Sequence, residues 1–247
     1  MRVYGINPVL EALRATRVTS IRVSPRANDR LTEIVRLAEA QGVVVHRVGP
    51  AELSRAAGGV EHRHQGVVAE LRGQETFSVE DLVIGAAGVP LIVVLDGIED
   101  PHNVGAVLRT VDAAGADGVV RQSRHAARLD GAAATASAGA VAHVKIAEVV
   151  NIARAVGTLK EAGVWTVGLT GDAGTRYDEV DLTVATALVV GAEGTGLRRL
   201  VRERCDWLAA IPMGGHVQSL NASVAAGIVL FDAVRQRRLK PAKGSRP

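Results

Sequence analysis

The sequence predicts an α/β fold in which a parallel sheet is covered by helices on both faces. From residue 89 onward, short and almost entirely apolar runs alternate with segments of helical periodicity. That alternation is typical of buried parallel strands joined by helices. Of the 247 residues, 47% are hydrophobic, which is enough for a substantial core in one large domain or two small ones. Pattern alone indicates a doubly wound, Rossmann-like sheet without a knot.

Residues 1–73 are predicted to form a small α/β unit ahead of that sheet. A helix opens at Asn7-Pro8, with proline at its first helical position. A second helix is capped by Asn28 or Asp29 and ends at Gly42. The remaining expected elements are strands at 21–23, 43–48 and 66–71 and a helix at 51–57.

Residues 74–89 are acidic and rich in Gly and Ala, so we expect a linker here, with Phe77 and Leu82 docking on a core.

A larger domain over 90–240 follows, and a basic tail at 241–247 ends the chain. The tail is either a solvated end or a nonspecific contact for phosphates. The larger domain is expected to contain strands at 91–95, 118–121, 143–147, 165–169, 187–190 and 207–211 and helices at 103–114, 151–162, 197–204 and 221–236.

Composition excludes several classes of protein. The chain has only two Trp, two Tyr and two Phe, which disfavours an RNA-binding face built on stacked aromatic rings. The net charge of +3 is compatible with nucleic acid and does not require it. Its one cysteine, Cys205, excludes an internal disulfide and is expected to be a buried, inert thiol. No apolar run approaches a membrane span of roughly 20 residues, and no signal peptide is evident, so we expect a soluble cytoplasmic protein.

The first polar motif, Asp96-Gly-Ile-Glu-Asp-Pro-His-Asn103, leaves the strand at 91–95 and enters a helix. We expect Asn103 to cap that helix or lie close to its cap, which would direct its amide toward the carboxyl edge of the sheet, where open α/β folds bind ligands. Arg109 lies six residues further on, so it shares no helical face with Asn103 unless Asn103 is in the cap. Taken alone, an ordinary cap and a solvated arginine would explain both residues.

Two more motifs follow in the last third of the chain. Gly191-Ala-Glu193-Gly-Thr-Gly196 connects a strand to a helix, but its glycine spacing differs from that of a dinucleotide-binding turn. Glu193 would repel a pyrophosphate and favour a cationic sulfonium. Ser219-Leu-Asn221 opens the last long helix, with one of its two polar residues as the cap, and it follows the turn Ile211-Pro-Met-Gly-Gly.

In order and spacing, these three motifs resemble those of the SpoU (TrmH-type) RNA ribose 2′-O-methyltransferases, and the resemblance spans nearly the whole chain. Within that family, the segments 96–103 and 231–237 are similar to the branch that methylates guanosine in 23S ribosomal RNA. The resemblance implies a SPOUT-type parallel sheet with a C-terminal trefoil knot. It also implies that residues 1–73 form an L30-like α/β domain that recognises the RNA substrate.

The resemblance further implies that S-adenosyl-L-methionine (SAM) is the methyl donor and that the target is a guanosine in the peptidyl-transferase P loop of 23S ribosomal RNA. It implies a homodimer whose SAM pockets lie at the knot interface. The implied catalytic residues are Asn103, Arg109, Glu193, Ser219 and Asn221, while the backbone of Gly191, Ile211 and Leu220 would hold SAM.

The role of Arg109 is open between two chemistries. Relatives have been interpreted with this arginine as general base, but a guanidinium has a pKa above about 12 and stays charged. A charged Arg109 would instead bind the target phosphate and stabilise the developing oxyanion. His216, Gln218 and Ala222 depart from the residues usual in the family, which concerns the target nucleotide and not the chemistry.

Other functions remain open at this point. Within the same chemistry, the chain could be a transfer-RNA or an antibiotic-resistance ribosomal RNA methyltransferase. From other classes, a noncatalytic RNA-binding assembly factor is opposed by the intact motifs, and a nucleotide-binding oxidoreductase by the glycine spacing. No metal is expected: His62 and His64 share a strand face, but no further ligands complete a shell.

Overall fold

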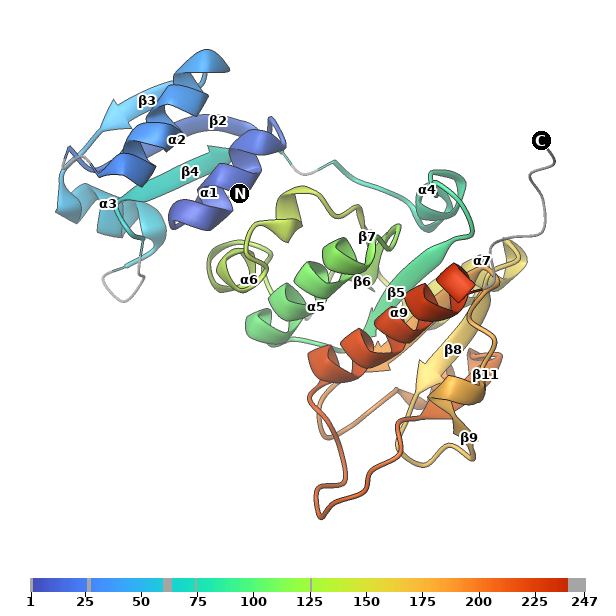
Figure 1. Cartoon of the computed structure of the whole chain (residues 1–247). Coiled ribbons are helices and arrows are strands. Elements are labelled where there is room, and N and C mark those ends of the chain that lie inside the picture. The colour runs from blue at the N-terminus through green and yellow to red at the C-terminus, as the bar shows by residue number, and fades with distance from the viewer. Residues whose placement is uncertain (1, 26–27, 60–63, 74, 125, 240–247) are drawn as a thin grey trace.

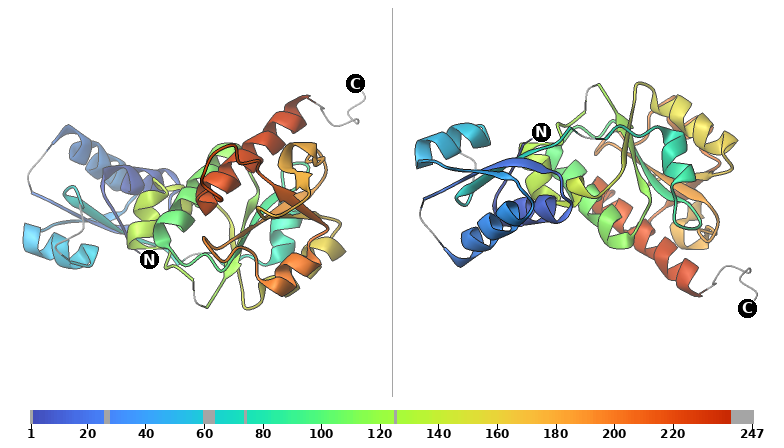
Figure 2. Two further views of the ribbon diagram at one scale, coloured as in Figure 1. Left: turned by 90° about the horizontal axis from the view of Figure 1, so that it is seen from below. Right: turned by 90° about the horizontal axis from the view of Figure 1, so that it is seen from above.

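The computed structural model describes residues 2–25, 28–59, 64–73, 75–124 and 126–239, which form two α/β units side by side (Figures 1 and 2). The smaller unit, blue to cyan in the figures, holds a four-stranded sheet, and the larger unit holds a seven-stranded sheet. The smaller unit consists of β1 (Arg2–Tyr4), α1 (Ile6–Arg14), β2 (Val18–Val23), α2 (Asp29–Ala40), β3 (Val44–Arg47), α3 (Pro50–Ala57) and β4 (Val67–Leu71).

The small sheet has the strand order β1-β4-β2-β3, with β4 antiparallel to both neighbours and β2 parallel to β3. Asn28, one of the two expected caps, caps α2 by accepting a hydrogen bond from the backbone N–H of Leu31. The predicted start of α1 at Asn7-Pro8 is wrong, because the helix begins at Ile6. Gly5, with a φ of +92°, makes the turn from β1, a strand that the sequence did not indicate.

The larger unit contains most of the chain. Its elements are α4 (Val79–Ile84), β5 (Leu91–Asp96), α5 (Pro101–Ala114), β6 (Gly118–Gln122), α6 (Gly131–Ala136), the 3₁₀ turn η1 (Ala140–Ala142), β7 (Ile146–Val149), α7 (Ile152–Glu161), β8 (Trp165–Leu169), β9 (Thr175–Arg176), the 3₁₀ turn η2 (Tyr177–Glu179), β10 (Thr186–Gly191), α8 (Arg199–Arg204), β11 (Trp207–Ala210) and α9 (Ala222–Leu239).

The large sheet has the order β7-β6-β5-β10-β8-β11-β9, and every neighbouring pair is parallel. Ile92 and Val94 of β5 face a core with α4, α7 and α8. Val93 and Leu95, the alternate residues, face a second core with α5 and α9. The prediction of a parallel sheet covered on both faces is therefore confirmed.

Part of the expected linker forms a helix. Ser78 caps α4 in a reciprocal capping box with Asp81. Leu82 is fully buried against the sheet, and Phe77 pairs with Ala147. The predicted docking of Phe77 and Leu82 is thus confirmed, and residues 78–84 belong to the core of the larger unit.

The strand expected at 143–147 begins later than predicted. Gly139, with a φ of +99°, turns the chain into η1, and β7 starts only at Ile146. η1 lies against the smaller unit, because Val141 belongs to the same apolar cluster as Val9 of α1. The two units therefore share a continuous core. Among the described residues, no helix is both long enough and apolar enough to cross a membrane.

Candidate active site

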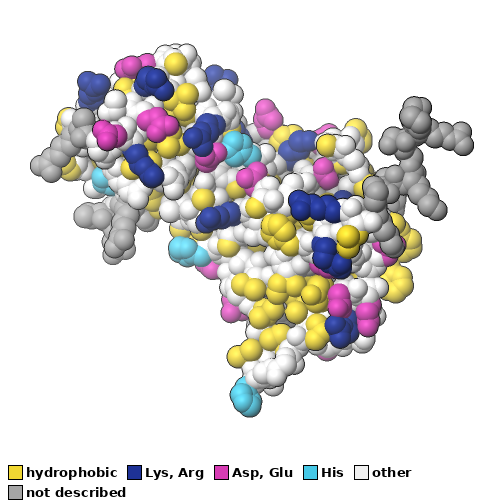
Figure 3. All heavy atoms as spheres, viewed as in Figure 1, with side chains coloured by type: hydrophobic (Ala, Val, Ile, Leu, Met, Phe, Trp, Pro, Cys, Tyr) yellow, Lys and Arg dark blue, Asp and Glu magenta, His cyan; other side chains and the backbone are white. Residues whose placement is uncertain are grey.

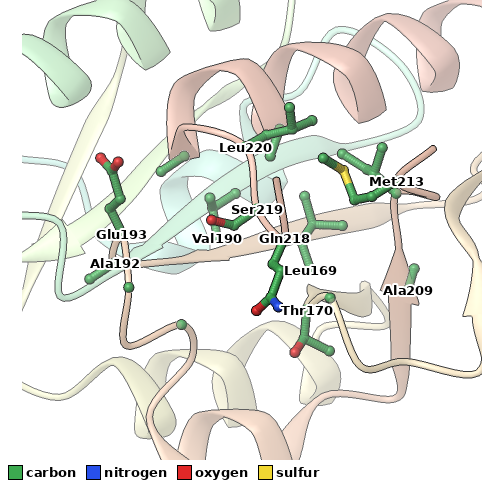
Figure 4. Close-up of a pocket in the computed structure, with 16 residues that line it drawn as sticks. Leu169, Thr170, Val190, Ala192, Glu193, Ala209, Met213, Gln218, Ser219 and Leu220 are labelled. Carbon is green, nitrogen blue, oxygen red and sulfur yellow. The ribbon is translucent and has the colours of Figure 1, made fainter. Parts of the chain in front are cut away.

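A pocket opens at the carboxyl ends of β8, β10 and β11, bounded by the loops after these strands and by the first turn of α9 (Figure 4). Ligands of open α/β sheets bind at this edge. The pocket is lined by Leu169, Thr170, Gly171, Val190, Ala192, Glu193, Gly194, Gly196, Ala209, Ile211, Met213, Gln218, Ser219, Leu220, Ala222 and Ala225. Thus segments of the second and third motifs form two of its walls.

The composition of the walls fits SAM. Leu169, Val190 and Ile211 give apolar surface for a flat heterocycle, and Thr170 and Ser219 supply a few polar groups. A mostly apolar cleft with a few placed polar groups is usual for a cofactor site. Ile211 and Leu220, two of the three residues expected to hold SAM, line the pocket, and the third, Gly191, lies between the lining residues Val190 and Ala192.

The second motif forms a tight turn in which the chain folds back on itself. The backbone N–H of Gly196 donates to the carbonyl of Ala192 at 2.9 Å, and both Gly194 and Gly196 have positive φ. A Cβ on Gly191 would collide with the backbone of Gly196 and Leu197. Glycine is therefore required at 191 by the close approach of two backbone segments.

The third motif is held at the start of α9 by Asn221. Its Oδ1 accepts hydrogen bonds from the backbone N–H of Ser223 at 2.9 Å and from the Ser223 hydroxyl at 2.6 Å. Its Nδ2 donates to Oδ1 of Asn103 at 2.8 Å. Asn221 is thus the cap that the sequence allowed, and it joins the third motif to the first across 118 residues.

Asn103 lies close to the cap of α5, one of the two expected placements, and is not the cap itself. Asp100 caps α5, accepting hydrogen bonds from the backbone of His102 and Asn103. Pro101 fits the first helical position because the missing N–H there has no partner in any case. Asn103 lies in the first turn, and its amide still reaches the third motif.

Glu193 and Ser219 both line the pocket, but from different sides. Glu193 is exposed at one edge, with its carboxylate directed away from Thr170 and Gln218 (Figure 4). Ser219 lies between Val190 and Leu220. The structure therefore brings Asn103 and Asn221 into contact and places Glu193 and Ser219 on the neighbouring rim.

Arg109 does not join this group within its own chain. It is exposed on α5 and lines a different cleft, between α5 and the helices α1 and α2 of the smaller unit. Six residues separate it from Asn103 on the same helix, which turns the two side chains to different faces. Arg109 forms no ion pair with another described residue.

Sequence reasoning missed one wall of the pocket and one anchor. Thr170 and Gly171 follow β8, and the end of that predicted strand in a parallel sheet was the signal available for them. Arg198, directly after the second motif, binds the buried carboxylate of Asp96. Nothing in the sequence pattern indicated this contact, because the two residues are 102 positions apart.

The histidine pair considered for a metal is only partly described. His62 lies outside the described residues, and the His64 ring accepts a hydrogen bond from the backbone of Gly66 at 3.1 Å. Across the described ranges, no group of three or more His, Cys, Asp and Glu residues is placed to hold a metal ion.

Cys205 should be unreactive in the folded protein. Burial, with Asp206 nearby, raises the pKa of its thiol from 9.0 to about 12, so the reactive thiolate is scarce at neutral pH. We expect iodoacetamide at pH 8 to leave Cys205 unmodified in the native protein and to alkylate it in denaturant. Intact-mass spectrometry measures both, and rapid native labelling would contradict the buried environment.

Two profiles of known protein families match the chain. The profile of the SpoU rRNA Methylase family matches residues 90–231, and a profile described as RNA 2′-O ribose methyltransferase substrate binding matches residues 2–77. A Burkholderia protein named 23S rRNA (guanosine-2′-O-)-methyltransferase RlmB is 44% identical over 238 residues, covering 95% of this chain and 96% of that protein.

Solved structures resemble the chain to different extents. The SpoU methyltransferase AviRb from Streptomyces viridochromogenes, in complex with AdoMet, superposes with a TM-score of 0.81 at 26% identity, covering 97% of this chain and 91% of that one. The TrmH/SpoU tRNA modifying enzyme of A. aeolicus is 32% identical with a TM-score of 0.56, and the match covers 65% of this chain and 83% of that one.

Proposed function

This chain belongs to the SpoU rRNA methylase family, and we propose that it transfers the methyl group of SAM to the ribose 2′-hydroxyl of a guanosine in 23S ribosomal RNA. The observation that carries the proposal is the pocket at the carboxyl edge of the sheet, beside the hydrogen bond between Asn103 and Asn221. The relative that is 44% identical along nearly the whole chain acts on this RNA by name. We further propose, as the motifs led us to expect, that the target guanosine lies in the peptidyl-transferase P loop.

We assign SAM binding to the loops around the pocket. The backbone at Gly191, Ile211 and Leu220 would hold SAM, whose sulfonium supplies an electrophilic methyl group. Glu193 places a negative charge at the pocket edge, which favours a cationic ligand over an anionic one. Ser219, which also lines the pocket, offers a hydroxyl.

The acceptor side would be formed by the first motif and its contact with the third. Asn221 holds Asn103 by a direct hydrogen bond, so the amide of Asn103 is oriented before RNA arrives. Arg109, kept charged, would bind the phosphate beside the target ribose and stabilise negative charge that develops on the 2′-oxygen. Because Arg109 lies away from its own pocket, this role requires a second copy of the chain.

We infer a homodimer in which α9 forms part of the interface. Val224 and Phe231, one helical heptad apart on α9, are each 49% exposed, and Val217 ahead of the helix is 65% exposed. Hydrophobic side chains gather over the N-terminal half of α9 and the segment before it (Figure 3). An apolar face of this kind is typical of a subunit interface.

The two units of the chain are proposed to have different roles. We assign RNA recognition to residues 1–73 and catalysis to 90–240, joined through 74–89; residues 240–247 of the basic end lie outside the described part of the chain. A ribosomal RNA substrate implies that the enzyme works in the cytoplasm. The tRNA-modifying relative matches only 65% of this chain, which favours ribosomal RNA over transfer RNA as the substrate.

A transfer assay tests the proposed function. Purified protein is incubated with methyl-labelled SAM and with unmodified 23S RNA, 16S RNA or transfer RNA. Label in 23S RNA alone is the expected result. Label in transfer RNA would move the substrate and keep the chemistry, whereas SAM binding without transfer to any RNA or ribosomal particle would favour the noncatalytic assembly factor.

The contact between Asn221 and Asn103 can be separated from the capping role of Asn221. Asn221→Asp retains the oxygen that caps α9 but loses the Nδ2 donor, so stability is expected to stay nearly unchanged while kcat falls on the order of 10- to 100-fold. Asn221→Ala should in addition lose about 1 kcal/mol of stability with the cap. Thermal melts and steady-state kinetics measure the two effects; full activity of Asn221→Asp would remove the contact from the mechanism.

A further inference from the structure

A buried carboxylate joins the first motif to the second outside the pocket lining. Asp96, the last residue of β5, is completely buried. Its Oδ2 accepts the backbone N–H of Arg198 at 2.7 Å, and its Oδ1 accepts Nε and Nη2 of the Arg198 guanidinium at 2.6 and 2.5 Å. Both carboxylate oxygens are therefore occupied by a single residue.

The register of the sheet explains how this contact forms. Gly191, the last residue of β10, pairs directly with Asp96 of β5, so the two motifs leave the sheet at the same level. The turn 192–196 then folds back and delivers Arg198 to the end of the neighbouring strand. Gly97, which follows Asp96, has a φ of +72°. A Cβ built on Gly97 would lie 3.8 Å from the Cβ of Ala192, so the two loops run close together here. The exit of the second motif is thus fastened to the entry of the first.

Arg198 does not line the pocket, and its side chain is half exposed. Burying a carboxylate costs free energy unless the carboxylate is paired and hydrogen-bonded. Asp96 therefore depends on Arg198, whereas a half-exposed arginine could remain solvated without a buried partner. One carboxylate oxygen of Asp96 binds the guanidinium of Arg198 and the other binds its backbone N–H, so the contact has a defined direction that a single hydrogen bond would not provide. This arrangement restrains orientation as well as distance.

We propose that Asp96 and Arg198 are a positioning pair for methyl transfer. They fix the loop that leads to Asn103, on the acceptor side, relative to the turn that carries Glu193, on the SAM side. This inference rests on the proposed function, since it assigns the two loops to the two reactants. The pair touches neither reactant and acts only through the loops that it holds together.

The expected signature is a loss of kcat without a matching loss of SAM affinity. A displacement of about 1 Å between aligned reactants can cost about 100-fold in rate. Arg198 does not line the SAM pocket, which also has walls from the loops after β8 and β11, and Arg198→Met adds no atom that would force the turn 192–196 open. We therefore expect Arg198→Met to lower kcat about 100-fold while the Kd for SAM changes by less than about threefold.

Arg199→Met is the matched control. Arg199 is adjacent in sequence and carries the same charge, but it pairs with Glu203 on the exposed surface of α8 at 3.0 Å. Arg199→Met should retain wild-type kcat. The kcat of Arg198→Lys, which keeps the charge but not the planar guanidinium, should lie between those of Arg198→Met and wild type.

Rates are divided by the number of SAM-binding sites measured calorimetrically, so that misfolded protein does not lower kcat. A normalised kcat of Arg198→Met within threefold of wild type would overturn the proposal.

Amide hydrogen exchange tests, independently of activity, whether Asp96 and Arg198 hold the two loops together. In Arg198→Met, amides in 97–100 and in 192–198 should both exchange faster, because each segment loses its anchor, while those of Arg199→Met stay as in the wild type. Faster exchange confined to 192–198 would overturn the link between the loops. If the wild-type protein methylates no RNA, the proposed function fails, and this exchange measurement still tests whether the pair couples the two loops.

Discussion

Replacing Gly191 with alanine is expected to abolish SAM binding at practical concentrations while leaving most of the fold intact. The added Cβ would collide with the backbone of Gly196 and Leu197, and backbone atoms cannot swing aside as a flexible side chain can. The turn must therefore open, which displaces Ala192 and Glu193 from the pocket wall. We expect the Kd for SAM to rise at least about 100-fold, which corresponds to about 2.7 kcal/mol.

Gly214→Ala is the control for this substitution. Gly214 lies in the loop between β11 and α9, and a Cβ there would meet no atom within 4 Å. Isothermal titration with SAM and a thermal melt are carried out on both variants. Tight SAM binding by Gly191→Ala would contradict the assignment of this turn to the SAM site.

Replacing Arg109 with alanine is expected to lower kcat about 100- to 1,000-fold without changing SAM affinity. Arg109 lines a cleft against α1 and α2 and not the pocket of its own chain, so its proposed role requires the pocket of a second subunit. Because an arginine that acts within its own chain would give the same loss, a second experiment has to distinguish the two arrangements.

Mixing two inactive variants tests this directly. Arg109→Ala keeps an intact SAM pocket, and Gly191→Ala keeps Arg109, so a heterodimer has one complete site if the partner subunit's Arg109 completes the pocket. Random pairing of equal amounts would then restore roughly a quarter of the wild-type rate. No restoration after verified subunit exchange would contradict the shared site.

The sequence motifs located the site better than they located its internal contacts. The alternation of apolar runs and helices predicted the parallel sheet, and Asn221 was among the expected caps because amide side chains satisfy the free N–H groups of a first helical turn. Ile211 lines the pocket because it directly follows β11 at the carboxyl edge of the sheet, and Leu220 lines it from the segment just ahead of α9. Periodicity alone led to an unknotted sheet; the SPOUT-type class was implied by the resemblance and is confirmed by the structural neighbours.

Contacts between distant segments could not be predicted in this way. Asp100 and Asn103 are both good caps, and the preference of proline for the first helical position, which Pro101 follows, selects Asp100. Leu82 lies in an acidic stretch whose composition indicates a linker, yet one buried leucine and a capping box are enough to dock a short helix. Arg198 meets Asp96 only because β5 and β10 are neighbours, and strand order cannot be derived from the sequence of either motif.

The most direct measurement is to map the methyl group that the protein adds to 23S RNA. Unmodified 23S RNA is incubated with the full chain and methyl-labelled SAM, digested, and analysed by mass spectrometry. We expect a single 2′-O-methylguanosine, located in the peptidyl-transferase P loop and absent when Arg109→Ala or Gly191→Ala replaces the wild type. A methyl group on a base, or on no RNA at all despite SAM binding, would contradict the assignment of this chain as a ribosomal RNA guanosine 2′-O-methyltransferase.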